Sequence, residues 1–487
     1  MRIKSAVRIL VLAGLLAAGA AVADDGLWGS LSACELSAAG GRLTASALCG
    51  ELEVPENPDE PHGRQLALAF AVKPAREKPR PDPIIFLAGG PGQSARELLP
   101  VMQASLHRLN RDRDLIFVDQ RGTGGSNALD CGFDQSDQPW LEPDSGDIDS
   151  RLRDCMSGWD AQPEFYTTPR AADDIDAFRH HYGIDSLNLI GGSYGTRVAL
   201  VYLRNHPDRV RSVVLDGVVP TRLALGSEHA SKLDQALDKL FAACSDDDLC
   251  SRAFPDLGEA FDSLKQYWRE NSRRLIVTHP RTGEGVELDF NAGMLAAALR
   301  FLAYAPETQA IIPYLIHEAS QTGNPERLAA QAMIVSDQMS EAISIGLNFA
   351  VSCSEDWPAW PQDIDQSGTL LGNSMTELTG QVCAWWPAGD VADDFHQPFK
   401  SDRPVLLLSG ELDPVTPPEY GDEVASQLEN SVHLTASGLG HIVMTNPCMS
   451  RLVTQFIQDN DPDSLDTECM QELGSTPFFL DLLGPAP

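Results

Sequence analysis

The chain has 487 residues, of which 43% are hydrophobic, and its formal net charge is −34. This length and apolar content suffice for one large domain with an inserted subdomain, or for two domains. Such an acidic surface repels phosphate backbones and anionic membranes, so nucleic acid is a poor partner and no stable membrane association of the mature chain is expected. The acidity is explained most simply as keeping an exported protein soluble.

The first residues have the layout of a cleavable secretion signal. Basic residues at positions 2, 4 and 8 precede an apolar run over 9–22, and alanines stand at positions 21 and 23. This run is shorter than the ~20 residues needed to span a bilayer, which disfavours the alternative of a membrane anchor. We therefore expect a signal peptide over 1–23 and a mature protein that is periplasmic or secreted.

Ten cysteines follow this segment, an even number that in an oxidising compartment indicates disulfides rather than free thiols. They fall in sequential couples: Cys34 and Cys49, Cys131 and Cys155, Cys244 and Cys250, Cys353 and Cys383, Cys448 and Cys469. Pairing between neighbours is the simplest expectation, although the sequence leaves other connectivities open. Neither the cysteine nor the histidine spacings match a metal site, so no metal and no other cofactor is expected.

Downstream of the leader, segments 51–54 and 65–72 alternate or run apolar around a turn rich in Pro and Asp, which predicts a β-hairpin. Short apolar runs then alternate with longer helix-like segments, at 84–87, 115–118, 187–190 and 213–215. This alternation is typical of a parallel sheet built from strand–helix–strand units. One intervening helix is expected from its cap Thr168 to about Gly183, because Pro169 suits a first helical turn.

The strand pattern disappears from Thr221 to about Gln397, where apolar residues recur at helical spacing, as at Leu233, Leu237 and Leu240. It resumes with apolar runs at 405–408 and 432–434. We therefore predict an α/β fold in which an inserted helical cap divides one mostly parallel sheet domain in sequence. The expected ranges are 24–220 and 398–487 for the two halves of the sheet domain, and 221–397 for the cap.

A serine between a predicted strand and a predicted helix is the candidate nucleophile. Ser193 stands in Gly191-Gly192-Ser193-Tyr194-Gly195, after the run that ends at position 190 and before a helical stretch over 196–205. Small residues on both sides of such a strained turn let the strand and the helix approach each other. The pentapeptide alone is a weak pattern, and its strand-turn-helix context is what favours catalysis.

A serine hydroxyl needs a histidine to take its proton and a carboxylate to orient that histidine. Asp413, just beyond the strand predicted at 405–408, is the candidate acid, and His441, in a glycine-containing loop after the last predicted strand, is the candidate base. Asp216, which follows the run at 213–215, is the rival acid. The chain order Ser, Asp, His is that of an α/β-hydrolase, which we take as the fold class.

Two backbone N–H groups are expected to stabilise the negative oxygen that forms during acyl transfer. One is that of Tyr194, directly after the serine, and the other is that of Gly90, in the loop Ala88-Gly89-Gly90-Pro91-Gly92 after the first predicted parallel strand. Glycines in this loop allow an N–H to point at the developing oxyanion. An ordinary Gly-Pro turn is the alternative interpretation.

At this point the sequence resembles the proline iminopeptidase and tripeptidyl aminopeptidase family of α/β-hydrolase exopeptidases. The resemblance is carried by the glycine loop at 89–92, the Asp119-Gln120-Arg121-Gly122-Thr123-Gly124 segment, the serine turn, the cysteine segments at 244–250 and 353–357, and the aspartate and histidine loops. It implies Ser193, Asp413 and His441 as the triad, with Gly90 and Tyr194 as oxyanion donors. Ala88 stands where proline iminopeptidases typically have His, which brings the chain closer to the tripeptidyl aminopeptidase branch.

An exopeptidase that acts from the N-terminus needs a carboxylate to pair with the substrate ammonium. Glu355 and Asp356, next to a cysteine in the predicted cap, are the candidates. Solvated surface carboxylates are the alternative in so acidic a chain. The loop from Asp119 to Gly124 is expected to have a structural role, with Arg121 binding carboxylates or carbonyls.

These features predict an exported serine aminopeptidase that acts on short peptides with a free N-terminus through an acyl-enzyme. One alternative keeps the triad but makes the protein an esterase or amidase for small non-peptide substrates. Another is a non-enzymatic binding protein on a hydrolase scaffold, which is disfavoured because no triad residue is missing.

Overall fold

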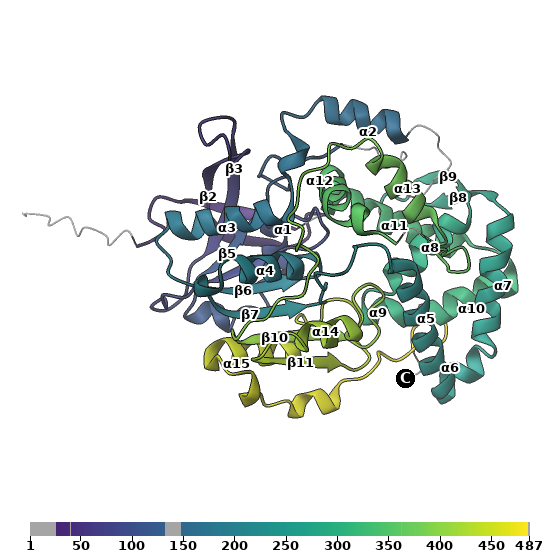
Figure 1. The fold of residues 1–487 in the computed structure, drawn as a ribbon. Helices are drawn as coiled ribbons and strands as arrows, with labels where there is room; N and C mark the ends of the chain where they lie inside the picture. Colours follow the sequence, from purple (N-terminus) through teal and green to yellow (C-terminus); the bar gives the residue numbers. More distant parts are fainter. Residues whose placement is uncertain (1–25, 39, 132–147, 362, 486–487) are drawn as a thin grey trace, which may run out of the picture.

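The computed structural model describes residues 26–38, 40–131, 148–361 and 363–485. The predicted leader at 1–23 lies outside these residues. Within them, no helix is both long enough and apolar enough to cross a membrane. Figure 1 shows a sheet domain beside a mainly helical part that follows β7 in the chain.

The described residues build one nine-stranded sheet in the order β1-β2-β3-β5-β4-β6-β7-β10-β11. Its strands are β1 (Ser32–Ser37), β2 (Thr44–Pro55), β3 (Gln65–Lys73), β4 (Ile84–Leu87), β5 (Leu115–Val118), β6 (Leu187–Gly192), β7 (Val210–Asp216), β10 (Val405–Gly410) and β11 (Ser431–Ala436). β1, β2, β3 and β5 pair antiparallel, whereas β5, β4, β6, β7, β10 and β11 pair in parallel. The predicted hairpin is β2 with β3, in which Leu52 lies opposite Leu68.

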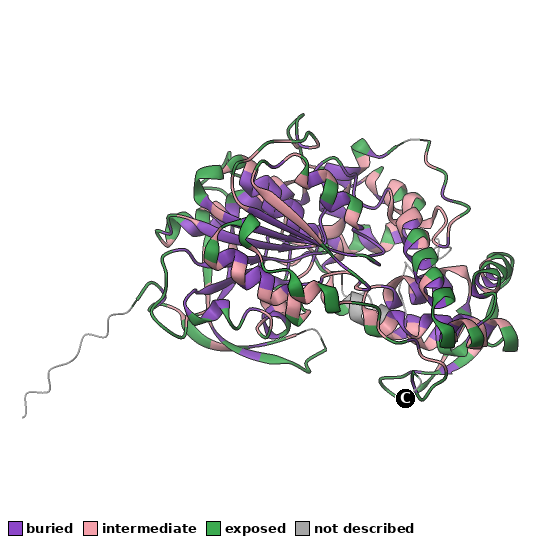
Figure 2. Cartoon of the chain, turned by 90° about the horizontal axis from the view of Figure 1, so that it is seen from below, coloured by how far each residue is buried: buried purple, intermediate pink, exposed green. Residues whose placement is uncertain are grey.

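The parallel strands are short continuous apolar runs because helices cover both faces of the sheet. Ile85 and Leu87 of β4 pack on the face covered by α3 (Thr168–His181), α4 (Tyr194–Asn205) and α14 (Pro418–Ala425). Ile84 and Phe86 pack on the opposite face, against α1 (Ala95–Met102) and α15 (Pro447–Asp459). Figure 2 shows the resulting pattern, with buried strands in the interior and exposed residues on the outer helices. This architecture is that of the α/β-hydrolase fold.

Helix α3 begins one residue earlier than its predicted cap implies. Its N-cap is Thr167, while Thr168 is the first helical residue and Pro169 follows in the first turn. The N–H and the hydroxyl of Thr168 both donate to the carboxylate of Glu355. A side chain from a distant part of the chain therefore satisfies the start of this helix, which no local pattern could indicate.

The segment between β7 and β10 is mainly helical and has an apolar core of its own. Its helices are α5 (His229–Asp246), α6 (Asp248–Ala253), α7 (Leu257–Glu270), α8 (Ala292–Leu302), α9 (Pro306–Gln309), α10 (Ile312–Thr322), α11 (Glu326–Ala342), α12 (Ile345–Val351) and α13 (Ser374–Cys383). α2 (Ile148–Ser157) lies earlier in the chain, before α3. A π-helical turn over Ser352–Asp356 continues α12.

This segment also contains a hairpin, β8 (Arg273–Thr278) with β9 (Gly285–Phe290), where only helices were predicted. Most residues of β8 are exposed, and Ile276 is 76% exposed. The strand therefore lacks the clear alternation of buried and exposed side chains that would have revealed it.

The ten cysteines form five disulfides, each between sequential neighbours. The bridges are Cys34–Cys49, Cys131–Cys155, Cys244–Cys250, Cys353–Cys383 and Cys448–Cys469. Stable disulfides of this number are typical of proteins that fold in an oxidising compartment.

Candidate active site

Ser193 lies on the sharp turn between β6 and α4, with φ 55° and ψ −126°. This conformation is strained for a residue with a side chain, and it is what presents a nucleophile above a sheet. The flanking glycines are required by packing: a Cβ at Gly195 would lie 2.1 Å from the carbonyl oxygen of Leu87, and one at Gly191 would lie 2.4 Å from that of Gly195. The pentapeptide thus brings α4 directly against β4.

His441 and Asp413 form a hydrogen-bonded pair, with Nδ1 of the histidine 2.8 Å from Oδ2 of the aspartate. The carboxylate of Asp413 also accepts from the N–H groups of Val415 and Thr416, each at 2.9 Å, and from the Thr416 hydroxyl at 2.8 Å. Burial alone would raise the pKa of Asp413, but His441 and the two amides outweigh it and hold that pKa below its usual range. The acid is therefore ionised and fixed in place.

Asp216, the rival acid, has a different set of partners. Its carbonyl accepts from the N–H of Ser193 at 2.8 Å. Its carboxylate accepts from the N–H groups of Val443 at 3.0 Å and Met444 at 2.8 Å, two and three residues after His441. Burial raises the pKa of Asp216 to about 6. Asp216 thus joins the serine turn to the histidine loop, while Asp413 bonds to the imidazole.

The glycine loop after β4 lies against the serine turn. A Cβ at Gly89 would lie 3.1 Å from Cβ of Ser193, and Gly90 has φ 105°, which a side chain rarely allows. Tyr194 is the first residue of α4, where backbone N–H groups lack helical partners. The predicted oxyanion donors Gly90 and Tyr194 therefore belong to two segments that meet at Ser193.

The Asp119–Gly124 segment supports this loop, as its expected structural role requires. Asp119 accepts from the Ser94 hydroxyl at 2.7 Å and from the N–H of Arg96 at 2.9 Å, at the start of α1. Arg121 binds both carboxylate oxygens of Asp174 at 2.7 Å and the carbonyl of Phe165 at 2.9 Å. The Asp119 bonds fix α1, the helix that follows the glycine loop, and the Arg121 bonds join the segment to α3.

Glu355 and Asp356 are buried, with exposures of 1% and 0%. Glu355 accepts from the hydroxyl of Thr168 at 2.7 Å, and Asp356 accepts from Nη1 of Arg197 at 2.7 Å and from the N–H of Leu225 at 2.8 Å. Both carboxylates thus already bind donors of the protein, and their predicted binding of a substrate ammonium stays a prediction. The alternative of solvated surface carboxylates is contradicted by their burial.

The two carboxylates bind residues that contact or belong to α4, the helix that follows the serine turn. The hydroxyl of Thr168 lies 2.6 Å from that of Tyr194, the residue after the nucleophile, and Arg197 lies one turn further along α4. Burial raises the pKa of Glu355 to about 7, although Arg197 opposes the shift. Sequence reasoning singled out this pair of acids but missed its partners, which lie more than 100 residues away.

One contact that the sequence did not indicate comes from the helical segment. The carbonyl of Tyr304 accepts from the N–H of His441 at 2.7 Å, and the two rings lie 5.1 Å apart at 73°. The N–H of Ser344 likewise donates to the carbonyl of Gly92 at 2.9 Å. Both the histidine loop and the glycine loop are therefore held by residues that follow β7 and precede β10.

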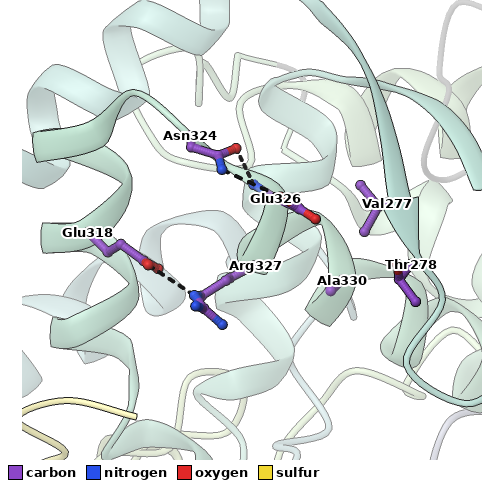
Figure 3. A pocket seen from close by; sticks show the side chains of 7 residues that line it. All are labelled: Val277, Thr278, Glu318, Asn324, Glu326, Arg327 and Ala330. Atoms are coloured by element: carbon purple, nitrogen blue, oxygen red, sulfur yellow. Dashed lines mark hydrogen bonds and ion pairs between the residues drawn. The ribbon is translucent and has the colours of Figure 1, made fainter. Parts of the chain in front are cut away.

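Two surface cavities lie away from these residues. The first, of about 230 Å³, is lined by Val277, Thr278, Glu318, Asn324, Glu326, Arg327 and Ala330. Figure 3 shows Glu318 and Arg327 of this pocket joined by an ion pair. The second, of about 430 Å³, is lined by Arg76, His107, Arg108, Arg111, Arg451, Thr454, Gln455 and Gln458. Neither cavity includes a residue of the predicted triad.

Known proteins give the chain a family context. A family model described as "alpha/beta hydrolase fold" matches residues 82–269, and one described as "TAP-like protein" matches residues 369–469. The chain is 27% identical to a tripeptidyl aminopeptidase of Streptomyces coelicolor, over 86% of this chain and 82% of the relative. It is 26% identical to the serine protease Hip1 of Mycobacterium tuberculosis, over 85% of this chain and 86% of the relative.

A shorter match joins the chain to a proline iminopeptidase of Neisseria gonorrhoeae, at 29% identity over 29% of this chain and 35% of the relative. The family models cover the serine turn and the aspartate and histidine loops, which are the segments that converge in the structure. Over most of its length the chain is therefore similar to tripeptidyl aminopeptidases and related serine peptidases of the α/β-hydrolase fold.

Proposed function

We propose that this enzyme is an exported serine aminopeptidase that releases N-terminal residues from short peptides through an acyl-enzyme intermediate. The observation that carries the chemistry is the buried His441–Asp413 pair, joined through Asp216 to the strained turn of Ser193. The names of the relatives, tripeptidyl aminopeptidase and proline iminopeptidase, support N-terminal release.

In the proposed reaction, Oγ of Ser193 attacks the carbonyl carbon of the scissile peptide bond while Nε2 of His441 takes the hydroxyl proton. Asp413 holds the Nδ1 proton and so keeps Nε2 free to act as the base. The N–H groups of Gly90 and Tyr194 stabilise the oxyanion. His441 then gives its proton to the leaving nitrogen as the C–N bond breaks, and water, activated in the same way, hydrolyses the acyl-enzyme.

Export is proposed from two independent features. The segment 1–23 has the composition of a signal peptide, and five disulfides fit an oxidising compartment outside the cytoplasm. N-terminal sequencing of the protein recovered from the periplasm or medium should begin at Asp24. A retained residue 1 in the exported protein would contradict cleavage.

The nucleophile is tested by Ser193→Ala, which should abolish hydrolysis of alanine peptides while the unfolding midpoint stays near that of the wild type. Labelling by a fluorophosphonate should disappear in the same variant. Persistent hydrolysis or labelling would reject Ser193 as the nucleophile.

The alternative of an esterase or amidase is favoured by one observation, the burial of Glu355 and Asp356, whose carboxylates already bind donors of the protein. A peptide anilide with a free N-terminus and its N-acetylated form separate the two functions. An aminopeptidase hydrolyses only the free form, whereas equal rates would favour the alternative.

A further inference from the structure

An arginine in the helical segment lies near the triad histidine without an acidic partner. Arg300, on α8, is half-buried, and its guanidinium donates to Sδ of Met375 at 3.0 Å and to Nδ1 of His229 at 3.4 Å. Among the described residues, no carboxylate lies within ion-pair distance of it. The chain has 70 acidic and 36 basic residues, so a half-buried cation without an acidic partner is unexpected here.

The position of Arg300 is fixed relative to His441 by the chain itself. Tyr304, four residues after Arg300, bonds to the N–H of His441 and packs its ring against the imidazole. The positive charge of Arg300 also acts on the pKa of both His441 and His229. Arg300 therefore lies within electrostatic reach of the group that protonates the leaving nitrogen.

His229, the first residue of α5, adds a second donor at this place. A guanidinium can only donate, so Nδ1 of His229 must accept from Arg300, and in a neutral ring the proton then sits on Nε2. Burial, together with Arg300, lowers the pKa of His229 to about 3, which keeps the ring neutral. Nε2 is buried and has no hydrogen-bond partner among the residues that the structure describes. Arg300 and His229 thus offer N–H donors near the triad, and no carboxylate of the described residues pairs with the guanidinium.

We propose that Arg300, assisted by His229, binds the C-terminal carboxylate of the leaving fragment when a short peptide is cleaved. This inference rests on the proposed peptidase function and names its substrate class as short peptides with a free carboxyl end. Because His441 must protonate the leaving nitrogen, the leaving fragment lies against His441 at that step. In a short fragment the carboxylate is close to that nitrogen and so comes within reach of the guanidinium.

The arrangement also has an electrostatic rationale. With a formal net charge of −34, the enzyme repels the terminal carboxylate of such a peptide, while it attracts the ammonium at the other end. A guanidinium without a competing protein carboxylate offsets this repulsion at the one place where the charge must be accommodated, and it can bind a carboxylate through two parallel hydrogen bonds.

The test compares alanine peptides of three to five residues with the same peptides amidated at the C-terminus. The wild type should have a kcat/KM about tenfold to a hundredfold higher for the acids, mainly through a lower KM, as expected for a charge-assisted hydrogen bond. Arg300→Gln should bring the ratio of acid to amide near one, and Arg300→Lys should retain part of it. Arg327→Gln, which removes the same charge from the pocket of Figure 3, should keep the wild-type ratio.

Equal kcat/KM for acids and amides in the wild type, or an unchanged ratio in Arg300→Gln, would overturn the proposal. If Arg300→Gln fails to fold in a thermal melt, Arg300→Lys decides, because an unchanged ratio there overturns it as well. An enzyme that is labelled by a fluorophosphonate but cleaves no alanine peptide would overturn the peptidase function and this inference with it.

Discussion

At the scale of single residues, the proposed triad is set by backbone groups as much as by side chains. The carboxylate of Asp413 receives the N–H groups of Val415 and Thr416, and the N–H of His441 donates to Tyr304. The imidazole and the carboxylate are thus oriented before any substrate binds. Because the two groups are already oriented, the 2.8 Å bond between Nδ1 of His441 and Oδ2 of Asp413 requires no reorganisation during the reaction.

Replacement of the acid should separate Asp413 from its rival. Asp413→Asn would present an amide to Nδ1 of His441 and favour the wrong tautomer, so we expect kcat to fall by about 10³- to 10⁴-fold. Asp216→Asn should cost less activity but lower the unfolding midpoint, because an amide nitrogen would face the N–H of Val443 or Met444. Steady-state kinetics and thermal melts of both variants measure this. An equal loss of kcat in the two variants would contradict the assignment of Asp413.

The acidity of His441 predicts the pH dependence of the reaction. Burial would lower the pKa of His441, but Asp413 outweighs it and raises that pKa above the ordinary 6.5. The base works only when neutral, so kcat/KM should rise with pH and its acid limb should have a midpoint above 6.5. In Asp413→Asn the residual activity should show this midpoint at lower pH. A profile of kcat/KM from pH 5 to 9 tests both statements, and a wild-type midpoint below 6.5 would refute them.

At the scale of elements, the contact between β4 and α4 depends on the absence of a side chain at position 195. Gly195→Ala would place a Cβ 2.1 Å from the carbonyl oxygen of Leu87, and the required shift of α4 should cost about 1–3 kcal/mol of unfolding free energy and move Ser193. Gly258→Ala is the matched control, because nothing lies within 4 Å of its Cβ in α7. The control should be neutral or stabilising by up to about 1 kcal/mol. Urea unfolding and kcat of both variants provide the measurement.

Glu355, whose carboxylate binds the first residue of α3, should make stability depend on pH. Its pKa of about 7 in the fold lies above its ordinary 4.5, so the folded state binds the proton more tightly than the unfolded state. Stability from this group is therefore complete below pH 4.5 and is lost as the pH rises to about 7. Glu355→Gln removes this dependence, so the unfolding free energy of the variant minus that of the wild type should increase from pH 4.5 to 7. A constant difference across this range would contradict the burial of an ionisable Glu355.

At the scale of the whole molecule, the disulfides close loops of very different length. Cys353–Cys383 spans 30 residues and fixes the π-helical turn that holds Glu355, whereas Cys244–Cys250 spans 6 residues. Loop-closure entropy assigns about 3.6 kcal/mol to the first and about 2.2 kcal/mol to the second at 25 °C. Replacing each pair by serines should therefore lower the unfolding free energy more for the longer loop. Urea unfolding of the two double variants measures both losses of unfolding free energy. An equal or larger loss for Cys244–Cys250 would contradict the entropic account.

Much of the sheet and the convergence of the catalytic candidates could be predicted from the sequence because their signals are local. A strand buried on both faces is a short apolar run, and Gly191 and Gly195 mark a close approach that any side chain would block. The partners of Glu355 and Asp356 could not be predicted, since Thr168 and Arg197 lie 187 and 159 residues away. The same holds for Tyr304 and Arg300, whose importance arises only when the helical segment meets the histidine loop.

Because the N–H of His441 donates to the carbonyl of Tyr304, the order in which parts of the chain fold matters for activity. The base comes late in the chain, and its loop is held by a residue that precedes β10. A chain still being synthesised, or one threaded unfolded through a membrane, therefore has no competent histidine even though Ser193 is already present. With His441 as the base, hydrolysis requires that the histidine loop has first folded against Tyr304.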